Sequence, residues 1–164
     1  MSEPTAVRRG VRIGVDVGQA RVGVAASDPD GVLATPVATL AAASTPQGGP
    51  DVSALAALVA QCGGTEVLVG LPRSLNGAEG PAARGVRSYA SALAAAVAPV
   101  PVRLVDERWT TVDAHRALHA AGRPGRSHRA VVDQVAAVLL LQAGLDAERA
   151  SGRPAGELVA AVAS

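Results

Sequence analysis

Hydrophobic residues alternate with polar or small residues near the start of the chain. Within residues 11–18 every second position is Val or Ile, which is the period of a β-strand. A similar alternation returns in residues 21–27, and a third apolar segment covers residues 32–40. The turn sequences between these segments are short, so the pattern predicts three consecutive antiparallel strands. Pro36 indicates that the third strand is an edge strand or contains a bulge, because proline lacks a backbone N–H.

The rest of the chain contains short apolar runs and longer segments with helical spacing. In chain order they predict a helix over 51–61, a strand over 66–71, a helix ending near 97, a strand over 102–107 and helices over 110–121 and 129–145. Residues 157–163 indicate a further short helix. Three antiparallel strands followed by two strand–helix units predict an α/β fold, with a mixed five-stranded sheet and helices on both of its faces.

Length and composition favour one folded domain. A chain of 164 residues has the usual size of a single domain. We expect a flexible arm over 1–10, the domain over 11–146 and a C-terminal tail over 147–164. Hydrophobic residues make up 49% of the chain and charged residues 18%, which excludes a disordered chain. Aromatic residues make up 1%, which excludes a broad aromatic platform for stacking bases.

Charge and cysteine content change this interpretation little. A net charge of +1 does not by itself indicate nucleic-acid binding. All the basic residues are Arg, which we interpret as the codon bias of a GC-rich genome. The single cysteine, Cys62, permits no intrachain disulfide, and we find neither a signal-peptide pattern nor an apolar run that could cross a membrane. We therefore expect a cytoplasmic protein with no membrane contact.

Acidic residues interrupt the apolar pattern of two predicted strands. Asp16 lies in the first strand and shares a face with Gly14 and Gly18, which would leave space for a metal ion and a phosphate. The alternative is an exposed or turn-capping aspartate. Asp106 and Glu107 end the strand over 102–107, and only one of them can share a face with Asp16 in a regular strand. The pattern alone does not choose between the two.

Asp133 is a third acidic residue in apolar surroundings. It lies on a stripe of small and apolar residues of the helix over 129–145. A buried carboxylate needs a cationic partner or a metal ion, so Asp133 either pairs with Arg129, one helical turn earlier, or binds metal. The acidic residues together indicate a hard-cation site, since ligand sets made only of oxygen suit Mg²⁺ or Mn²⁺ and not zinc.

Arginines near the acidic positions are candidates for contacts to a nucleic-acid backbone. Guanidinium groups bind phosphate through paired hydrogen bonds, and helix N-termini attract anions. Residues 123–129, directly before the helix that carries Asp133, form a basic segment, although such a segment is often only a soluble loop. The candidate nucleic-acid-binding residues are Arg21, Arg73, Asn76, Arg108, Arg126 and Arg129.

Four segments, in this order and spacing, resemble the YqgF/RuvX family. They are Val15-Asp16-Val17-Gly18 with Val22-Gly23-Val24-Ala25, Val69-Gly70-Leu71-Pro72 with Asn76-Gly77-x-Glu79, Asp106-Glu107-Arg108-Trp109-Thr110-Thr111, and Val132-Asp133-x-x-Ala136-Ala137. The resemblance covers residues 11–146. The chain departs from the family pattern where Gln19-Ala20 replaces Thr-Lys, and where Arg126, His128 and Arg129 replace lysines.

The resemblance implies an RNase H-like fold and a nuclease that depends on Mg²⁺ or Mn²⁺, with two ions expected. Proteins of this family are described as pre-16S rRNA nucleases and, earlier, as Holliday junction resolvases. Carried over by motif, the catalytic and metal-binding carboxylates are Asp16, Glu107 and Asp133, which favours Glu107 over Asp106. We expect Asp16 to bridge the two ions. The implied role is maturation of the 5′ end of 16S rRNA in the bacterial cytoplasm.

Two other functions remain open on the sequence. One is a Holliday junction resolvase that acts on branched DNA as a homodimer, whereas an RNA nuclease can work as a monomer. The other is a non-catalytic RNA-binding module in ribosome assembly, in which the acidic residues serve only the structure. Replacement of Asp16 by Asn separates a catalytic from a structural role for this carboxylate.

Overall fold

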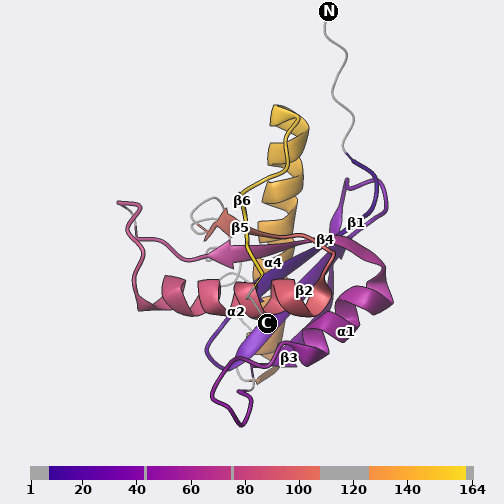
Figure 1. The fold of residues 1–164 in the computed structure, drawn as a ribbon. Coiled ribbons are helices and arrows are strands. Elements are labelled where there is room, and N and C mark those ends of the chain that lie inside the picture. The colour runs from indigo at the N-terminus through magenta and orange to yellow at the C-terminus, as the bar shows by residue number, and fades with distance from the viewer. Residues whose placement is uncertain (1–7, 43, 75, 108–125, 162–164) are drawn as a thin grey trace, which may run out of the picture.

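A mixed sheet of six strands forms the centre of the molecule (Figure 1). The computed structural model describes residues 8–42, 44–74, 76–107 and 126–161, with only the backbone of residues 126–131. The strand order is β3-β2-β1-β4-β5-β6, in which β4 and β5 run parallel to β1 and the other neighbours are antiparallel. The strands are β1 (Val11–Val17), β2 (Arg21–Ser27), β3 (Ala34–Ala41), β4 (Gly64–Leu71), β5 (Val102–Asp106) and β6 (Glu157–Leu158).

Helices cover both faces of the sheet, as the sequence predicts. The described helices are α1 (Ser53–Cys62), α2 (Pro81–Val97) and α4 (Arg126–Ser151). Figure 1 shows α1 and α2 on one side of the sheet and α4 on the other. Among the described residues, no helix is long and apolar enough to cross a membrane. The predicted helix over 110–121 and the expected arm before residue 8 lie outside the described residues.

Two hydrophobic layers hold these elements together. The alternating Val and Ile residues of β1 pack with α1 and α2 in the larger layer, which contains the fully buried Ile13 and Val15. The opposite face of the sheet packs on α4 through Ala137, Leu140 and Leu141. Since one face of each strand belongs to each layer, the even-numbered residues of β1, Asp16 included, face α4.

The third strand confirms both meanings of Pro36. β3 is an edge strand, and the register between β2 and β3 shifts next to the pairing of Ala25 with Pro36. A proline fits there because the N–H that it lacks is not needed at a bulge of an edge strand.

The C-terminal part of the chain departs from the prediction in two ways. Helix α4 starts at Arg126 and not at residue 129, and it continues past 145 to Ser151, where Gly152 follows with a φ of 74°. The short helix predicted over 157–163 is wrong at its start, because Glu157–Leu158 form β6 beside β5 and make the sheet six-stranded instead of five-stranded. This two-residue strand depends on pairing with a distant strand, which local hydrophobic periodicity does not report.

Buried charges connect elements at the amino ends of the parallel strands. Arg12 is 2% exposed and lies 3.3 Å from Glu148 of α4. Arg8 contacts Glu148 and Glu66 at 2.6 and 3.0 Å, and Arg103 contacts Glu66 at 3.1 Å. This group, which we call the basal ion network, joins β1, β4, β5 and the C-terminal part of α4.

Candidate active site

Asp16 and Asp133 are brought together by a close approach of α4 to the sheet. Asp16 pairs with Gly23 of the neighbouring strand β2. A side chain on Gly23 would clash with the main-chain oxygen of Asp133, so glycine allows the helix backbone to lie directly on the strand at this point. The segment of α4 that carries Asp133 therefore lies beside Asp16.

The two glycines that flank Asp16 have different surroundings. A Cβ atom on Gly14 would lie 2.6 Å from the Cβ atom of Leu141, so α4 fills the space above this residue. At Gly18 a Cβ atom would lie 2.9 Å from the main-chain oxygen of Arg21, in the turn between β1 and β2. Gly14 therefore serves helix packing and Gly18 a tight turn, and the space that the sequence indicates lies on the side of Gly18, which lines a cleft that reaches Asp16.

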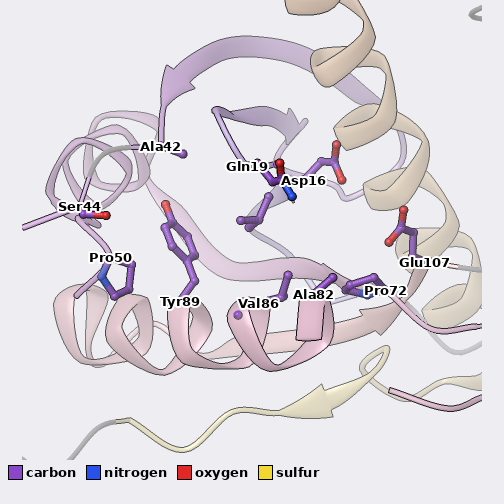
Figure 2. Close-up of a pocket in the computed structure, with 13 residues that line it drawn as sticks. Asp16, Gln19, Ala42, Ser44, Pro50, Pro72, Ala82, Val86, Tyr89 and Glu107 are labelled. Atoms are coloured by element: carbon purple, nitrogen blue, oxygen red, sulfur yellow. The ribbon is translucent and has the colours of Figure 1, made fainter. Parts of the chain in front are cut away.

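The structure answers which residue at the end of β5 shares the face of Asp16. Val105 packs in the layer with α4, whereas Leu104 packs in the layer with α1 and α2. If the alternation continues, Asp106 faces the layer with α1 and α2, and Glu107 faces α4. Figure 2 shows the carboxylates of Asp16 and Glu107 on the same side of the sheet, next to that helix. Their strands are parallel, so both residues lie at the same edge of the sheet.

The electrostatics of Asp16 are those of a carboxylate among other carboxylates. Burial is the largest cause that raises its pKa, and the negative charges of Glu107 and Asp133 raise it further, to about 6. Among the described residues, no hydrogen-bond donor satisfies the Asp16 carboxylate. Glu107 and Asp133 are thus each close enough to act on the charge of Asp16, and a cation at this position would relieve the repulsion.

Asp133 has a cationic partner, but not the one that its helix position indicates. Nε of Arg21 donates a hydrogen bond of 2.8 Å to Oδ2 of Asp133. The partner that the sequence predicts is Arg129, one turn earlier on the same helix, and the side chain of Arg129 is not described. The strand residue Arg21 is distant in sequence from Asp133, and only the three-dimensional fold makes it a neighbour.

The donor set fits Mg²⁺ or Mn²⁺, which prefer carboxylate oxygens. Within the part of the chain that the structure describes, no three acidic, histidine or cysteine side chains are arranged to hold one ion together. Oδ2 of Asp133 instead accepts a hydrogen bond from Arg21. Asp16 and Glu107 line the same space. Among the described residues, Asp16 forms no ion pair with a basic side chain.

A cleft of about 500 Å³ begins at Asp16 and Glu107 and extends along the edge of the sheet to α2 (Figure 2). We call it the edge cleft. Its far end is formed by Tyr89 of α2 and Pro50 of the loop before α1. Tyr89 is 6% exposed, and burial, followed by the negative charge of Asp51, raises its pKa to about 12. The Tyr89 hydroxyl therefore remains protonated at all physiological pH values.

The predicted nucleic-acid-binding residues are dispersed in the structure. Arg73 follows β4, lies 3.6 Å from Glu79, and has a buried Nε with no hydrogen-bond partner. Asn76 accepts hydrogen bonds from Ser74 and from the main chain of Ala78, which is a turn-forming role. Arg126 and Arg129 lie in the first turns of α4, and their side chains are not described. Arg108 lies outside the described residues.

Sequence reasoning missed the residues that form the edge cleft away from the carboxylates. Tyr89 and Gly85 belong to α2 and line the cleft. The signals that could have found them are a lone tyrosine and a mid-helix glycine in a segment rich in alanine. Both features have common structural explanations, so the sequence alone does not mark them.

Comparisons with known proteins show the family and the fold of the chain. The family model RuvX, described as "Holliday junction resolvase", matches residues 10–147. A protein of Streptomyces coelicolor named "Putative pre-16S rRNA nuclease" is 55% identical over 160 residues, which cover 95% of this chain and 92% of that protein. A Nocardioides protein with the same name is 57% identical over 158 residues, covering 93% and 98% of the two chains.

Among solved structures, Thermus thermophilus RuvC in complex with a Holliday junction substrate superimposes with a TM-score of 0.57. The match covers 88% of this chain and 99% of RuvC at 17% sequence identity, so it supports a common fold. The shared architecture is the RNase H-like fold that the four sequence segments imply.

Proposed function

Because the chain belongs to the RuvX family, we propose that it is a nuclease that hydrolyses phosphodiester bonds during 5′-end processing of pre-16S rRNA. Support for a nuclease comes from the family and from relatives that cover nearly the whole chain. Support for the RNA substrate comes from the names of those relatives. Processing of precursor rRNA takes place in the bacterial cytoplasm, so we assign the chain to this compartment.

The observation that carries the proposal is the convergence of Glu107 and Asp133 on Asp16. They come from β1, from the residue after β5 and from α4, and the two others raise the pKa of Asp16. Carboxylates that repel one another in a partly buried site destabilise a protein unless something binds them. A site with that property is a candidate for function.

We assign Asp16, Glu107 and Asp133 as the residues that would hold two Mg²⁺ or Mn²⁺ ions. Such ions supply Lewis acidity that activates water and stabilises the leaving 3′ oxygen. The chain itself positions the oxygens through the rigid sheet and α4. Arg21 must release Asp133 for this carboxylate to bind an ion, and its guanidinium is then available for a backbone phosphate.

The other candidate arginines have a positioning role in this proposal. Arg73, Arg108, Arg126 and Arg129, together with Asn76, would contact the substrate backbone, which fixes the orientation of a nucleic acid without reading its sequence. RNA binding should therefore weaken as the salt concentration rises.

The test is cleavage of a labelled RNA that carries a 16S 5′ precursor sequence, in Mg²⁺, Mn²⁺ or chelator. We expect metal-dependent cleavage by the wild type and a loss of at least 100-fold in Asp16→Asn, on the scale typical of a removed catalytic group. Asp30→Asn makes the same chemical change at an exposed position and should retain activity. Cleavage that survives in chelator or in Asp16→Asn would contradict the assignment.

A second function is favoured by the description of the family model, which names a Holliday junction resolvase. A resolvase needs two active sites on one junction, and therefore a homodimer. A four-way DNA junction run beside the RNA separates the two activities, and the molecular mass in solution separates a monomer from a dimer. If neither substrate is cut while RNA still binds, the chain acts as a non-catalytic RNA-binding module.

A further inference from the structure

The edge cleft continues well beyond the carboxylates that the proposed function uses. It runs from Asp16 and Glu107 to Tyr89 and Pro50, and its volume of about 500 Å³ lies in the usual range of small-molecule sites. We propose that the edge cleft is a subsite for one unstacked base of the RNA strand, next to the phosphate that is cut. This inference rests on the proposed nuclease function, because the carboxylates define where that phosphate lies.

The charge of the cleft favours a base over a phosphate as its occupant. Apart from the two carboxylates at one end, the described lining residues are uncharged, among them Gln19, Ser44, Pro50, Val86 and Tyr89. A phosphate placed there would lose its water without gaining a cation from any lining residue that the structure describes, which is unfavourable. A base is uncharged, has two apolar faces and carries polar groups at its edge, and these properties match the lining.

The walls of the cleft provide both kinds of contact. The rings of Pro50 and Tyr89 and the side chain of Val86 are apolar surfaces against which a flat ring can pack. Tyr89 and Ser44 at this end, and Gln19 beside Asp16, carry polar groups that, among the described residues, have no hydrogen-bond partner. Figure 2 shows the Tyr89 hydroxyl directed toward Ala42, with Ser44 on one flank of the ring and Gln19 on the other.

The free Tyr89 hydroxyl is the most informative of these groups. The residue is 6% exposed, and a buried tyrosine hydroxyl normally has a partner. Its oxygen is not among the fully buried side-chain atoms without a partner, so it remains accessible from the cleft. A base edge with a hydrogen-bond acceptor would satisfy this donor.

Gly85 keeps the cleft open on the side of α2. It lies inside a helix of 17 residues, where glycine is unfavourable, and a Cβ atom there would meet nothing within 4 Å. A larger side chain at this position would extend into the edge cleft. Gly85→Leu should therefore block the cleft. Because leucine favours helices and the position is open, the substitution should leave α2 and the core intact.

The experiment measures RNA binding to the full-length Asp16→Asn protein, which we expect not to cut its ligand. Single-stranded RNAs from the 16S 5′ precursor carry one abasic site at each position in turn, and fluorescence anisotropy gives the dissociation constants. We expect one position at which loss of the base weakens binding by about 10-fold, the scale of one stacked base. Gly85→Leu, added to the same protein, should weaken binding of the intact RNA by a similar factor. It should leave the affinity for the RNA that lacks this base unchanged.

Ser88→Leu is the matched control, since it places leucine on an exposed position of the same helix outside the cleft. It should bind every RNA as the parent protein does. Tyr89→Phe removes only the hydroxyl and should weaken binding of the intact RNA several-fold. It should have no effect on binding of the RNA that lacks the base at the sensitive position. A flat abasic scan, or a position effect that survives Gly85→Leu, would overturn the subsite.

The two proposals fail in different ways. If the wild type cuts RNA with metal while the abasic scan is flat, the subsite is wrong and the nuclease function stands. If one base is captured in a manner that depends on Gly85 while no cleavage occurs, the subsite stands and the nuclease function is wrong.

Discussion

Asp16 combines partial burial with the negative charges of two other acidic side chains. Its pKa of about 6 means that the folded chain holds a proton more tightly than the unfolded chain, in which an aspartate has a pKa near 3.9. The favourable contribution to stability is therefore complete below about pH 4 and is lost as the pH rises through 6. At neutral pH the ionised carboxylate destabilises the metal-free fold.

Asp16→Asn should consequently raise the stability of the metal-free protein. In chelator at pH 7.5 we expect a gain on the order of 1 kcal/mol, or roughly 3 °C in Tm, which disappears as the pH falls to 4. Thermal unfolding of both proteins from pH 4 to 8 measures it. In Mg²⁺ or Mn²⁺ the order should reverse, because only the wild type gains from ion binding. An equal response of both proteins to metal would remove Asp16 from the ion site.

Arg21 competes with a metal ion for Asp133, since its Nε lies 2.8 Å from Oδ2 of that residue. Arg21→Gln should therefore lower the Mn²⁺ concentration needed for half-maximal cleavage by several-fold, while the KM for RNA rises through the loss of a phosphate contact. Titration of cleavage with Mn²⁺ and with RNA separates the two effects. Arg9→Gln, on an exposed ion pair with Asp30, is the control and should change neither.

At the scale of elements, helix packing depends on where glycines lie. Gly85 of α2 faces open space, whereas Gly144 of α4 lies against β4, and a Cβ atom there would come within 2.5 Å of Leu68. Replacement by alanine should therefore change the stability of the fold in opposite directions at these two positions. We expect Gly85→Ala to stabilise the fold by about 0.7 kcal/mol and Gly144→Ala to destabilise it by about 2 kcal/mol. Urea unfolding measures both, and a shared sign would contradict the packing.

Local patterns were sufficient to predict the elements that bring the carboxylates together. Alternation in β1 placed Asp16 on the polar face, and the predicted strands β1, β2, β4 and β5 are present. The sequence resemblance favoured Glu107, and the alternation of β5 gives the same choice. These predictions succeed because a strand in contact with two helical layers needs a regular pattern on each face.

Contacts between distant segments account for what the sequence did not predict. The pairing of Arg21 with Asp133, the strand β6 and the clash that Gly23 avoids all join residues that are far apart in sequence. No periodicity carries such information. The roles of Asp16, Glu107 and Asp133 as catalytic residues remain predictions that the variants above test.

At the scale of the whole molecule, the active-site edge and the basal ion network lie at opposite ends of the parallel strands. Helix α4 connects them, because it carries Asp133 near its start and Glu148 near its end. Stability and chemistry should therefore respond to different substitutions.

Glu148→Gln tests this separation. It leaves Arg12 buried without its ionised partner, and breaking a buried ion pair costs about 3 kcal/mol. We expect a large drop in Tm but unchanged kcat at a temperature where the variant is folded. Asp146→Asn, at an exposed position of the same helix, should shift the stability by less than about 0.5 kcal/mol. An equal loss of stability in both variants would show that the basal ion network stabilises the fold no more than an exposed ion pair does.

The two edges of the sheet also determine how the chain behaves when it is concentrated. An exposed edge strand can recruit strands from other copies and start aggregation. On β3 the proline at position 36 offers no N–H to an incoming strand, and the bulge beside it twists the edge. At the other edge, β6 covers part of β5 and is only two residues long. Neither edge is a good template for polymerisation, so we expect the folded protein to resist fibril formation and any dimer to use another surface.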